Sequence, residues 1–150
     1  MTTEEKTPAV RIMAAPFEGG CHCRAIRYTC TAEPALSAHC HCTDCQKTTG
    51  SGFATVVFVP TAALTITGRA QAYTVTGDEG GTVTRHFCAT CGSPVYSEAS
   101  IVPGMTFLKA GSLDDPRGLR PSMQMWTKSK RPWSTLGDDV PGFPGNPPPP

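Results

Sequence analysis

Residues 85–92 read Arg-His-Phe-Cys-Ala-Thr-Cys-Gly, and this stretch decides how the rest of the chain is interpreted. Its cysteines, Cys88 and Cys91, are separated by two residues, a spacing that lets both sulfurs reach one metal ion. Gly92 can adopt the positive φ that closes such a turn. A closed structural zinc site needs four ligands, so a second pair of cysteines must come from elsewhere in the chain.

The second pair is Cys21 and Cys23, which follow Gly19 and Gly20 near the start of the chain. The two glycines allow this segment to bend, so that both sulfurs can bind the same ion. We therefore predict one structural zinc site with four cysteine ligands. Reduced thiols that hold no metal are the alternative reading of these four residues.

A third cluster, residues 40–45, reads Cys-His-Cys-Thr-Asp-Cys and differs in its ligand number. Cys40, Cys42 and Cys45 supply three thiolates within six residues, enough to bind one ion locally. Three protein ligands with an open fourth position are the pattern of a catalytic zinc site. The alternative is a second closed site, in which Cys30, His39 or His41 supplies the fourth ligand.

Cys30 and the histidines are weaker candidates for ligands. Residues 25–30 alternate in polarity, which places Cys30 beside Ile26 and Tyr28 on the apolar face of a strand. We therefore predict that Cys30 is a buried, unreactive thiol. His22, His39 and His41 each adjoin a cysteine and are predicted to lie beside the metal or on the surface, and His86 is predicted to lie on the sheet.

The composition favours short strands over helices. The chain has 150 residues, and its 15 glycines and 15 prolines disfavour a helical bundle. Single helical turns are predicted only at Thr43–Thr48 and Asp114–Arg117. The sequence predicts an all-β fold of short strands at Ala25–Cys30, Phe53–Val59, Leu64–Thr67, Ala72–Thr76, Thr82–Phe87, Val95–Ser97 and Met105–Ala110.

We expect one domain over residues 16–137, between a flexible N-terminal arm (1–15) and a disordered tail rich in proline and glycine (138–150). The net charge of +1 argues against a nucleic-acid partner. The longest apolar stretch, Phe53–Val59, is too short to cross a membrane, and the first ten residues do not resemble a secretion signal. We therefore expect a cytoplasmic protein, in which eight cysteines bind metal more readily than they form disulfides.

A zinc ion held by three thiolates carries a net charge of about −1, which makes it a poor activator of water. It suits a fourth soft ligand, such as the sulfur of a substrate thiol. A thiol bound there would lose its proton, and its electron-rich sulfur could attack an aldehyde carbon, or the reverse reaction could cleave a C–S bond. The chain contains no hydrolase, P-loop or dinucleotide-binding motif that favours another chemistry.

Residues 20–23, 39–50 and 85–92 resemble the glutathione-dependent formaldehyde-activating enzyme family, which also includes centromere protein V-like domains. The resemblance covers roughly Phe17 to Trp133, and the chain differs from the family pattern at Arg24 and Gln46. It implies an Mss4-like fold of short antiparallel strands stapled by zinc. It implies two zinc ions per chain, one structural on Cys21, Cys23, Cys88 and Cys91, and one catalytic on Cys40, Cys42 and Cys45.

The resemblance also implies a carbon–sulfur lyase of the S-(hydroxymethyl)glutathione synthase type, which joins a thiol such as glutathione to formaldehyde. Lys47, Arg85 and Lys109 are candidate partners for the carboxylates of such a thiol. The main alternative is a non-catalytic β module that binds another protein. Another alternative, a methionine-sulfoxide reductase, would need Cys30 as a reactive thiol. A zinc ribbon that binds nucleic acid is disfavoured by the low net charge of the chain. The sequence does not fix the oligomeric state.

Overall fold

The structure is a computed structural model that describes residues 11–77, 80–136 and 140–148. Its described residues form ten short strands, one α-helix and three 3₁₀ turns. The helix is α1 (Thr43–Thr49), and the turns are η1 (Thr61–Ala63), η2 (Ala110–Ser112) and η3 (Thr127–Ser129). The strands are β1 (Phe17–Gly20), β2 (Arg27–Cys30), β3 (Leu36–Cys40), β4 (Ala54–Pro60), β5 (Leu64–Thr67), β6 (Gln71–Thr76), β7 (Thr82–Phe87), β8 (Pro94–Ala99), β9 (Met105–Lys109) and β10 (Met123–Met125).

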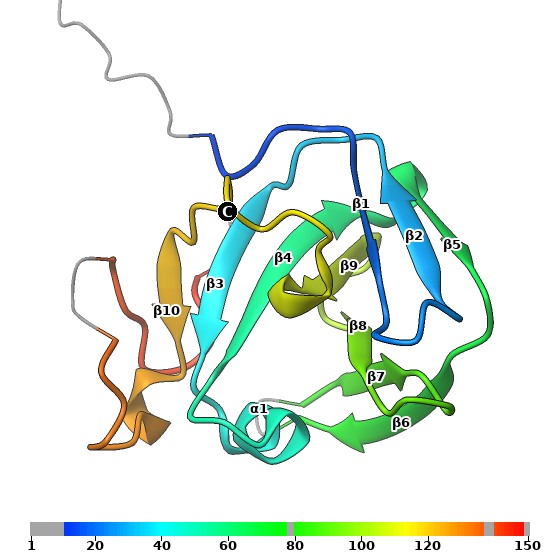
Figure 1. The fold of residues 1–150 in the computed structure, drawn as a ribbon. Helices are drawn as coiled ribbons and strands as arrows, with labels where there is room; N and C mark the ends of the chain where they lie inside the picture. The colour runs from blue at the N-terminus through cyan, green and yellow to red at the C-terminus, as the bar shows by residue number, and fades with distance from the viewer. Residues whose placement is uncertain (1–10, 78–79, 137–139, 149–150) are drawn as a thin grey trace, which may run out of the picture.

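The strands form two sheets. The larger sheet has seven strands in the order β10-β3-β4-β9-β8-β7-β6, and the smaller has three in the order β1-β2-β5. All neighbours pair antiparallel except β10 and β3, which run parallel. Figure 1 shows the larger sheet curving from β10 on the left to β6 and β7 at the lower right, with the smaller sheet beside it. The predicted all-β fold is confirmed.

The main core forms between the two sheets, where alternating apolar residues meet. Ile26, Tyr28 and Cys30 are all at most 2% exposed, as the alternation of residues 25–30 predicts. They belong to one cluster with apolar residues of β4, β8 and β9, including Val57 and Leu108. Burial raises the pKa of the Cys30 thiol, which donates to the carbonyl of Ala32 at 3.4 Å. Cys30 is therefore a core residue.

Gly19 is required where β1 crosses this core. A Cβ atom at this position would collide with the hydroxyl of Tyr28 and the carbonyl of Ser112. Tyr28 Oη and Ser112 Oγ share a hydrogen bond of 2.7 Å, and Gly19 forms an isolated bridge with Leu113. The absence of a side chain thus lets β1 approach both β2 and the segment after β9.

The seven predicted strands are confirmed with small shifts of their ends, and the predicted turn at Thr43–Thr48 is α1. The helical turn predicted at Asp114–Arg117 is wrong, since this segment is a bend and a hydrogen-bonded turn. There the Asp114 carboxylate accepts hydrogen bonds from the Arg27 guanidinium of β2. Strands β1, β3 and β10 lie outside the segments predicted as strands.

The N-terminal boundary of the domain lies earlier than expected. Residues 1–10 of the expected arm fall outside the described residues, but Met13 is 5% exposed and packs in the main core. The Ile12 carbonyl accepts a hydrogen bond of 2.9 Å from the Arg120 amide. Residues 11–15 therefore pack as part of the domain. Among the described residues, no helix is long and apolar enough to cross a bilayer.

The C-terminal segment also differs from the disordered tail expected over 138–150. Residues 140–148 lie along β10. The backbone amide of Gln124 donates to the Pro141 carbonyl at 2.8 Å, and the backbone carbonyl of Gln124 accepts from the Phe143 amide at 2.9 Å. The indole N–H of Trp126 donates to Asn146 Oδ1 at 2.9 Å. Proline lacks an N–H but keeps a carbonyl, so a proline-rich segment can still accept hydrogen bonds at a sheet edge. Residues 138–139 and 149–150 of the expected tail lie outside the described residues.

Removal of residues 140–150 should destabilise the domain, because it leaves the edge of β10 and the Trp126 indole without these partners. At about 0.5–1.5 kcal/mol per hydrogen bond, the expected loss is about 2–5 kcal/mol in the free energy of unfolding. Urea denaturation of the full and shortened chains measures it, and Asn146→Ala should show a smaller part of the loss. Equal stability of the two chains would mean that the tail contributes nothing to the fold.

Candidate metal centres

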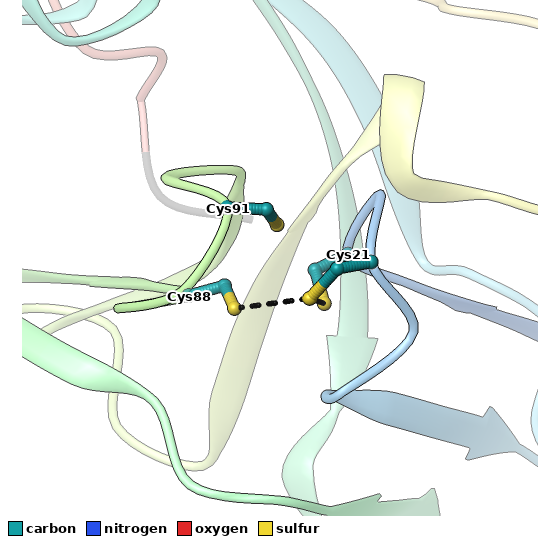
Figure 2. Close-up of side chains that lie close together, drawn as sticks. Cys21, Cys88 and Cys91 are labelled. Atoms are coloured by element: carbon teal, nitrogen blue, oxygen red, sulfur yellow. Dashed lines mark hydrogen bonds between the residues drawn. The ribbon is translucent and has the colours of Figure 1, made fainter.

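Cys21, Cys23, Cys88 and Cys91 form one compact group, with all four sulfurs within 4.8 Å of one another. Cys23 Sγ lies 3.6 Å from Cys21 Sγ and 3.7 Å from Cys88 Sγ. Figure 2 shows the sulfurs of Cys21, Cys88 and Cys91 turned toward a common point. Four sulfurs about 2.3 Å from a tetrahedral zinc ion lie about 3.8 Å apart, whereas a disulfide needs about 2.05 Å. The group therefore fits a closed zinc site, and all eight cysteines are free thiols.

Two turns hold this group in place. Cys21 directly follows β1, and its sulfur accepts a hydrogen bond of 3.2 Å from the Ile26 amide. Cys88 directly follows β7, and Gly92 closes the second turn at φ 77° by donating to the Cys88 carbonyl at 2.8 Å. Hydrogen bonds from Ser93 lower the pKa of Cys91 to about 5. In each turn, hydrogen bonds thus favour the thiolate of one cysteine, Cys21 in the first and Cys91 in the second, and the thiolate is the form that binds metal.

Cys40, Cys42 and Cys45 form the second compact group, again with all sulfurs within 4.8 Å. Cys40 ends β3, Cys42 caps the start of α1, and Cys45 lies in its first turn. The Cys42 sulfur accepts a hydrogen bond of 3.1 Å from the Cys45 amide, so the thiol replaces the oxygen of an ordinary helix cap. Cys40 and Cys45 are buried, and Cys42 is half-buried. The three residues can hold one metal ion from a single short loop.

Two cations from other strands lie beside the three-cysteine group. Arg85 of β7 approaches Cys45 Sγ with Nη2 at 4.0 Å, and its Nε and Nη1 are buried without a partner among the described residues. Lys109, at the end of β9, is 8% exposed, and burial lowers the pKa of its ammonium. Hydrogen bonds from the Cys40 and Cys42 thiols, together with the charges of Lys109 and Arg85, hold the pKa of Cys45 well below its usual value against the effect of burial. Lys47, the third cation singled out from the sequence, is exposed in the last turn of α1.

The described residues do not supply a fourth protein ligand to the second group. Neither Cys30 nor any histidine belongs to either cluster of close ligand atoms. His39 Nδ1 lies 2.8 Å from Thr55 Oγ1, and His86 shares a hydrogen bond of 2.7 Å with Glu98. His41 is fully buried, with Nε2 2.9 Å from Gln124 Oε1 of β10. The alternative of a closed second site therefore finds no support in this geometry.

Gln46 has a positioning role that the sequence analysis did not predict. Its side-chain amide donates to the His41 carbonyl at 2.7 Å and to the Ser129 carbonyl at 3.0 Å, and its oxygen accepts from Arg131 Nε at 2.9 Å. It thereby fastens α1 and the three-cysteine loop to the segment after β10. No local pattern could have indicated this, because the partners Ser129 and Arg131 are more than 80 residues away.

A cleft of about 840 Å³ opens beside the four-cysteine group and extends to neighbours of the three-cysteine group, although Cys40, Cys42 and Cys45 do not line it. Cys21, His22 and Ser93 line the end near the four-cysteine group. Ala54 and Lys109 line it near the three-cysteine group, where Ala54 pairs with Cys40 across β3 and β4. Its volume lies in the usual range for small-molecule sites.

The fold and the site together define a β-sheet protein with two cysteine-only candidate metal sites and a cleft beside the four-cysteine site. The family model for the glutathione-dependent formaldehyde-activating enzyme matches residues 16–129, and the chain belongs to this family.

Two curated relatives provisionally named as glutathione-dependent formaldehyde-activating enzymes also match. The protein from Emericella nidulans is 32% identical over 90 residues, which cover 57% of this chain and 45% of the relative. The protein from Penicillium rubens is 35% identical over 85 residues, which cover 53% and 44%. The chain therefore spans slightly less than half the length of the curated relatives that it matches.

Among solved structures, the crystal structure of a Rhodobacter sphaeroides protein aligns with a TM-score of 0.55. The alignment covers 84% of this chain and 99% of that protein, at 18% sequence identity. At this identity the likeness concerns the fold alone.

The four-cysteine and three-cysteine groups should differ in how tightly they bind zinc. We expect two zinc ions per chain at neutral pH, with the three-cysteine group binding more weakly because it offers one ligand fewer. Protons compete with zinc for thiolates, so this group should lose its ion first as the pH falls. Native mass spectrometry over a pH series measures both effects. A single ion per chain in the presence of excess zinc would contradict the two-site interpretation.

Cys88→Ala should prevent folding. The four-cysteine group joins segments 65 residues apart, so its metal-binding free energy, on the order of 10 kcal/mol, is also folding free energy. Cys30→Ala is the matched control, since it removes a buried sulfur outside both groups and should cost about 1–2 kcal/mol with no loss of zinc. Circular dichroism and zinc analysis measure the two outcomes. Loss of a zinc ion from Cys30→Ala would instead make Cys30 a ligand.

Proposed function

We propose that this chain is a zinc-dependent carbon–sulfur lyase that joins a thiol such as glutathione to a small aldehyde such as formaldehyde, or releases the aldehyde again. The observation that carries the proposal is the three-cysteine group, which lacks a fourth protein ligand among the described residues and lies beside two cations. The family of the chain, and the provisional names of its two curated relatives, support the same reaction class.

The two cysteine groups divide the work between structure and chemistry in this proposal. Cys21, Cys23, Cys88 and Cys91 would hold a structural zinc ion. Cys40, Cys42 and Cys45 would hold the second ion, which would supply a soft Lewis acid able to bind the sulfur of the substrate thiol and lower its pKa. The free thiols of the cysteines suit a reducing compartment such as the cytoplasm.

Arg85 and Lys109 balance the negative charge of this site. Three cysteine thiolates exceed the charge of one divalent ion by about one unit, and a substrate thiolate adds a second. The two cations bring two positive charges beside Cys45, where burial weakens screening by water. They therefore favour the thiolate form of the substrate.

The proposed step forms one bond from the substrate sulfur to the aldehyde carbon. The electron pair of the C=O double bond moves to the oxygen, which takes up the proton that the thiol released, so the product is an S-hydroxyalkyl adduct. Lys109 lines the cleft, and its ammonium can stabilise the negative charge that develops on this oxygen. The reverse reaction breaks the same C–S bond and returns the proton to the thiol.

Cys42→Ala should remove the activity and leave the fold. The three ligands lie within one loop, so loss of their ion constrains little beyond α1, and the variant should keep one zinc ion and its circular dichroism spectrum. Exchange spectroscopy by NMR on glutathione and formaldehyde measures the rate of adduct formation, with Cys30→Ala as the active control. If Cys42→Ala unfolds as completely as Cys88→Ala, the second ion is structural and the interaction-module alternative becomes the better one.

A further inference from the structure

The cleft beside the four-cysteine group carries an excess of positive charge. Three cations line it, namely Arg24, Arg27 and Lys109, against a single carboxylate, Asp114. Arg27 binds this carboxylate with both ends of its guanidinium, with Nη1 2.9 Å from Oδ1 and Nη2 on Oδ2. This pair uses up the one acidic group of the lining. Arg24 and Lys109 are the cations that remain for a ligand.

Arg24 stands at the end of the cleft nearest the four-cysteine group. Its side chain is exposed and forms no hydrogen bond or close ion pair with any described residue. The charge of Arg24 lowers the pKa of the Asp114 carboxyl, but the hydrogen bonds and charge of Arg27 lower it more. The guanidinium is therefore available to a molecule in the cleft.

The backbone of Arg24 is strained. Its φ is 69°, in the left-handed region that glycine adopts freely and that other side chains rarely adopt. The turn after Cys21 imposes this conformation, because the Arg24 amide donates to the Cys21 carbonyl at 3.1 Å. A residue without a side chain would satisfy the turn better. No contact within the described fold requires the Arg24 side chain. An anion that binds from outside the protein would account for a side chain at this position.

We propose that Arg24 binds a carboxylate of the substrate thiol and thereby makes the site selective for anionic thiols of peptide size. This inference rests on the proposed function, since it places the thiol group near Cys40, Cys42 and Cys45 and the carboxylate at the opposite end of the cleft. A volume of about 840 Å³ leaves room for a tripeptide such as glutathione, which has two carboxylates. Lys109 faces the reacting end, and Arg24 sets the preference at the other end.

Arg24→Gly tests this assignment without a folding defect, because glycine relieves the strain of the turn. We expect an equal or higher melting temperature, which a purely structural role of the side chain would not give. In the zinc-loaded protein without aldehyde, the Kd for glutathione, measured by NMR titration, should rise about tenfold or more, as expected for the loss of a charge-assisted hydrogen bond. Arg24→Lys should recover most of the affinity.

The kinetic readout separates binding from chemistry. With glutathione and formaldehyde, Arg24→Gly should raise KM about tenfold with a much smaller change in kcat. With 2-mercaptoethanol, which has no carboxylate, the effect should stay below about twofold. Arg69→Gly is the matched control, because Arg69 is also exposed but does not line the cleft. It should leave both thiols unaffected.

The results distinguish failure of this inference from failure of the proposed function. An unchanged Kd for glutathione in Arg24→Gly, or an equal loss for both thiols, would overturn the role of Arg24 while the lyase activity stands. Binding of glutathione that depends on Arg24, without adduct formation by the unmodified protein, would overturn the lyase and keep the anion site. Absence of glutathione binding by the unmodified protein would overturn the inference.

Discussion

The convergence of Cys21 and Cys23 with Cys88 and Cys91 is the constraint on which the rest of the structure depends. It joins the end of β1 to the turn between β7 and β8, and so fixes the smaller sheet against one end of the larger. A chain of this size with so many prolines and glycines has a modest core, and closing a loop of 65 residues is entropically unfavourable. A metal ion held by these four cysteines would offset that cost, because its ligands come together only in the folded state.

The same convergence creates the cleft. One wall carries the turn after β1, with its strained Arg24, and another carries Lys109 at the end of β9. Ala54 of the lining pairs with Cys40, and the charge of Lys109 acts on Cys45, so the cleft also reaches neighbours of the three-cysteine group. The four-cysteine group thus helps to position the walls of the cleft.

The three-cysteine loop is local in sequence, but its position depends on segments far along the chain. Strand β10 runs parallel to β3 up to Cys40, and the His41 amide donates to the Met125 carbonyl at 3.0 Å. Gln46 ties α1 to the segment after β10, and residues 140–148 in turn cover the outer edge of β10. This layered support keeps the three sulfurs together beside Arg85 and Lys109.

The sequence by itself determined the features that depend on short spacings. It determined which cysteines pair locally, the strands with alternating apolar residues, the burial of Cys30 and the family, because ligand spacing and side-chain alternation are properties of a few adjacent residues. Only the tertiary structure decided the rest. Strands β1, β3 and β10 have three to five residues, and β10 pairs with β3 from much earlier in the chain, so the sequence pattern around them does not mark them. Strand order and register are set by burial over the whole domain. They decide that the tail packs on β10, that Arg85 and Lys109 meet beside Cys45, and that Arg24 lines the cleft.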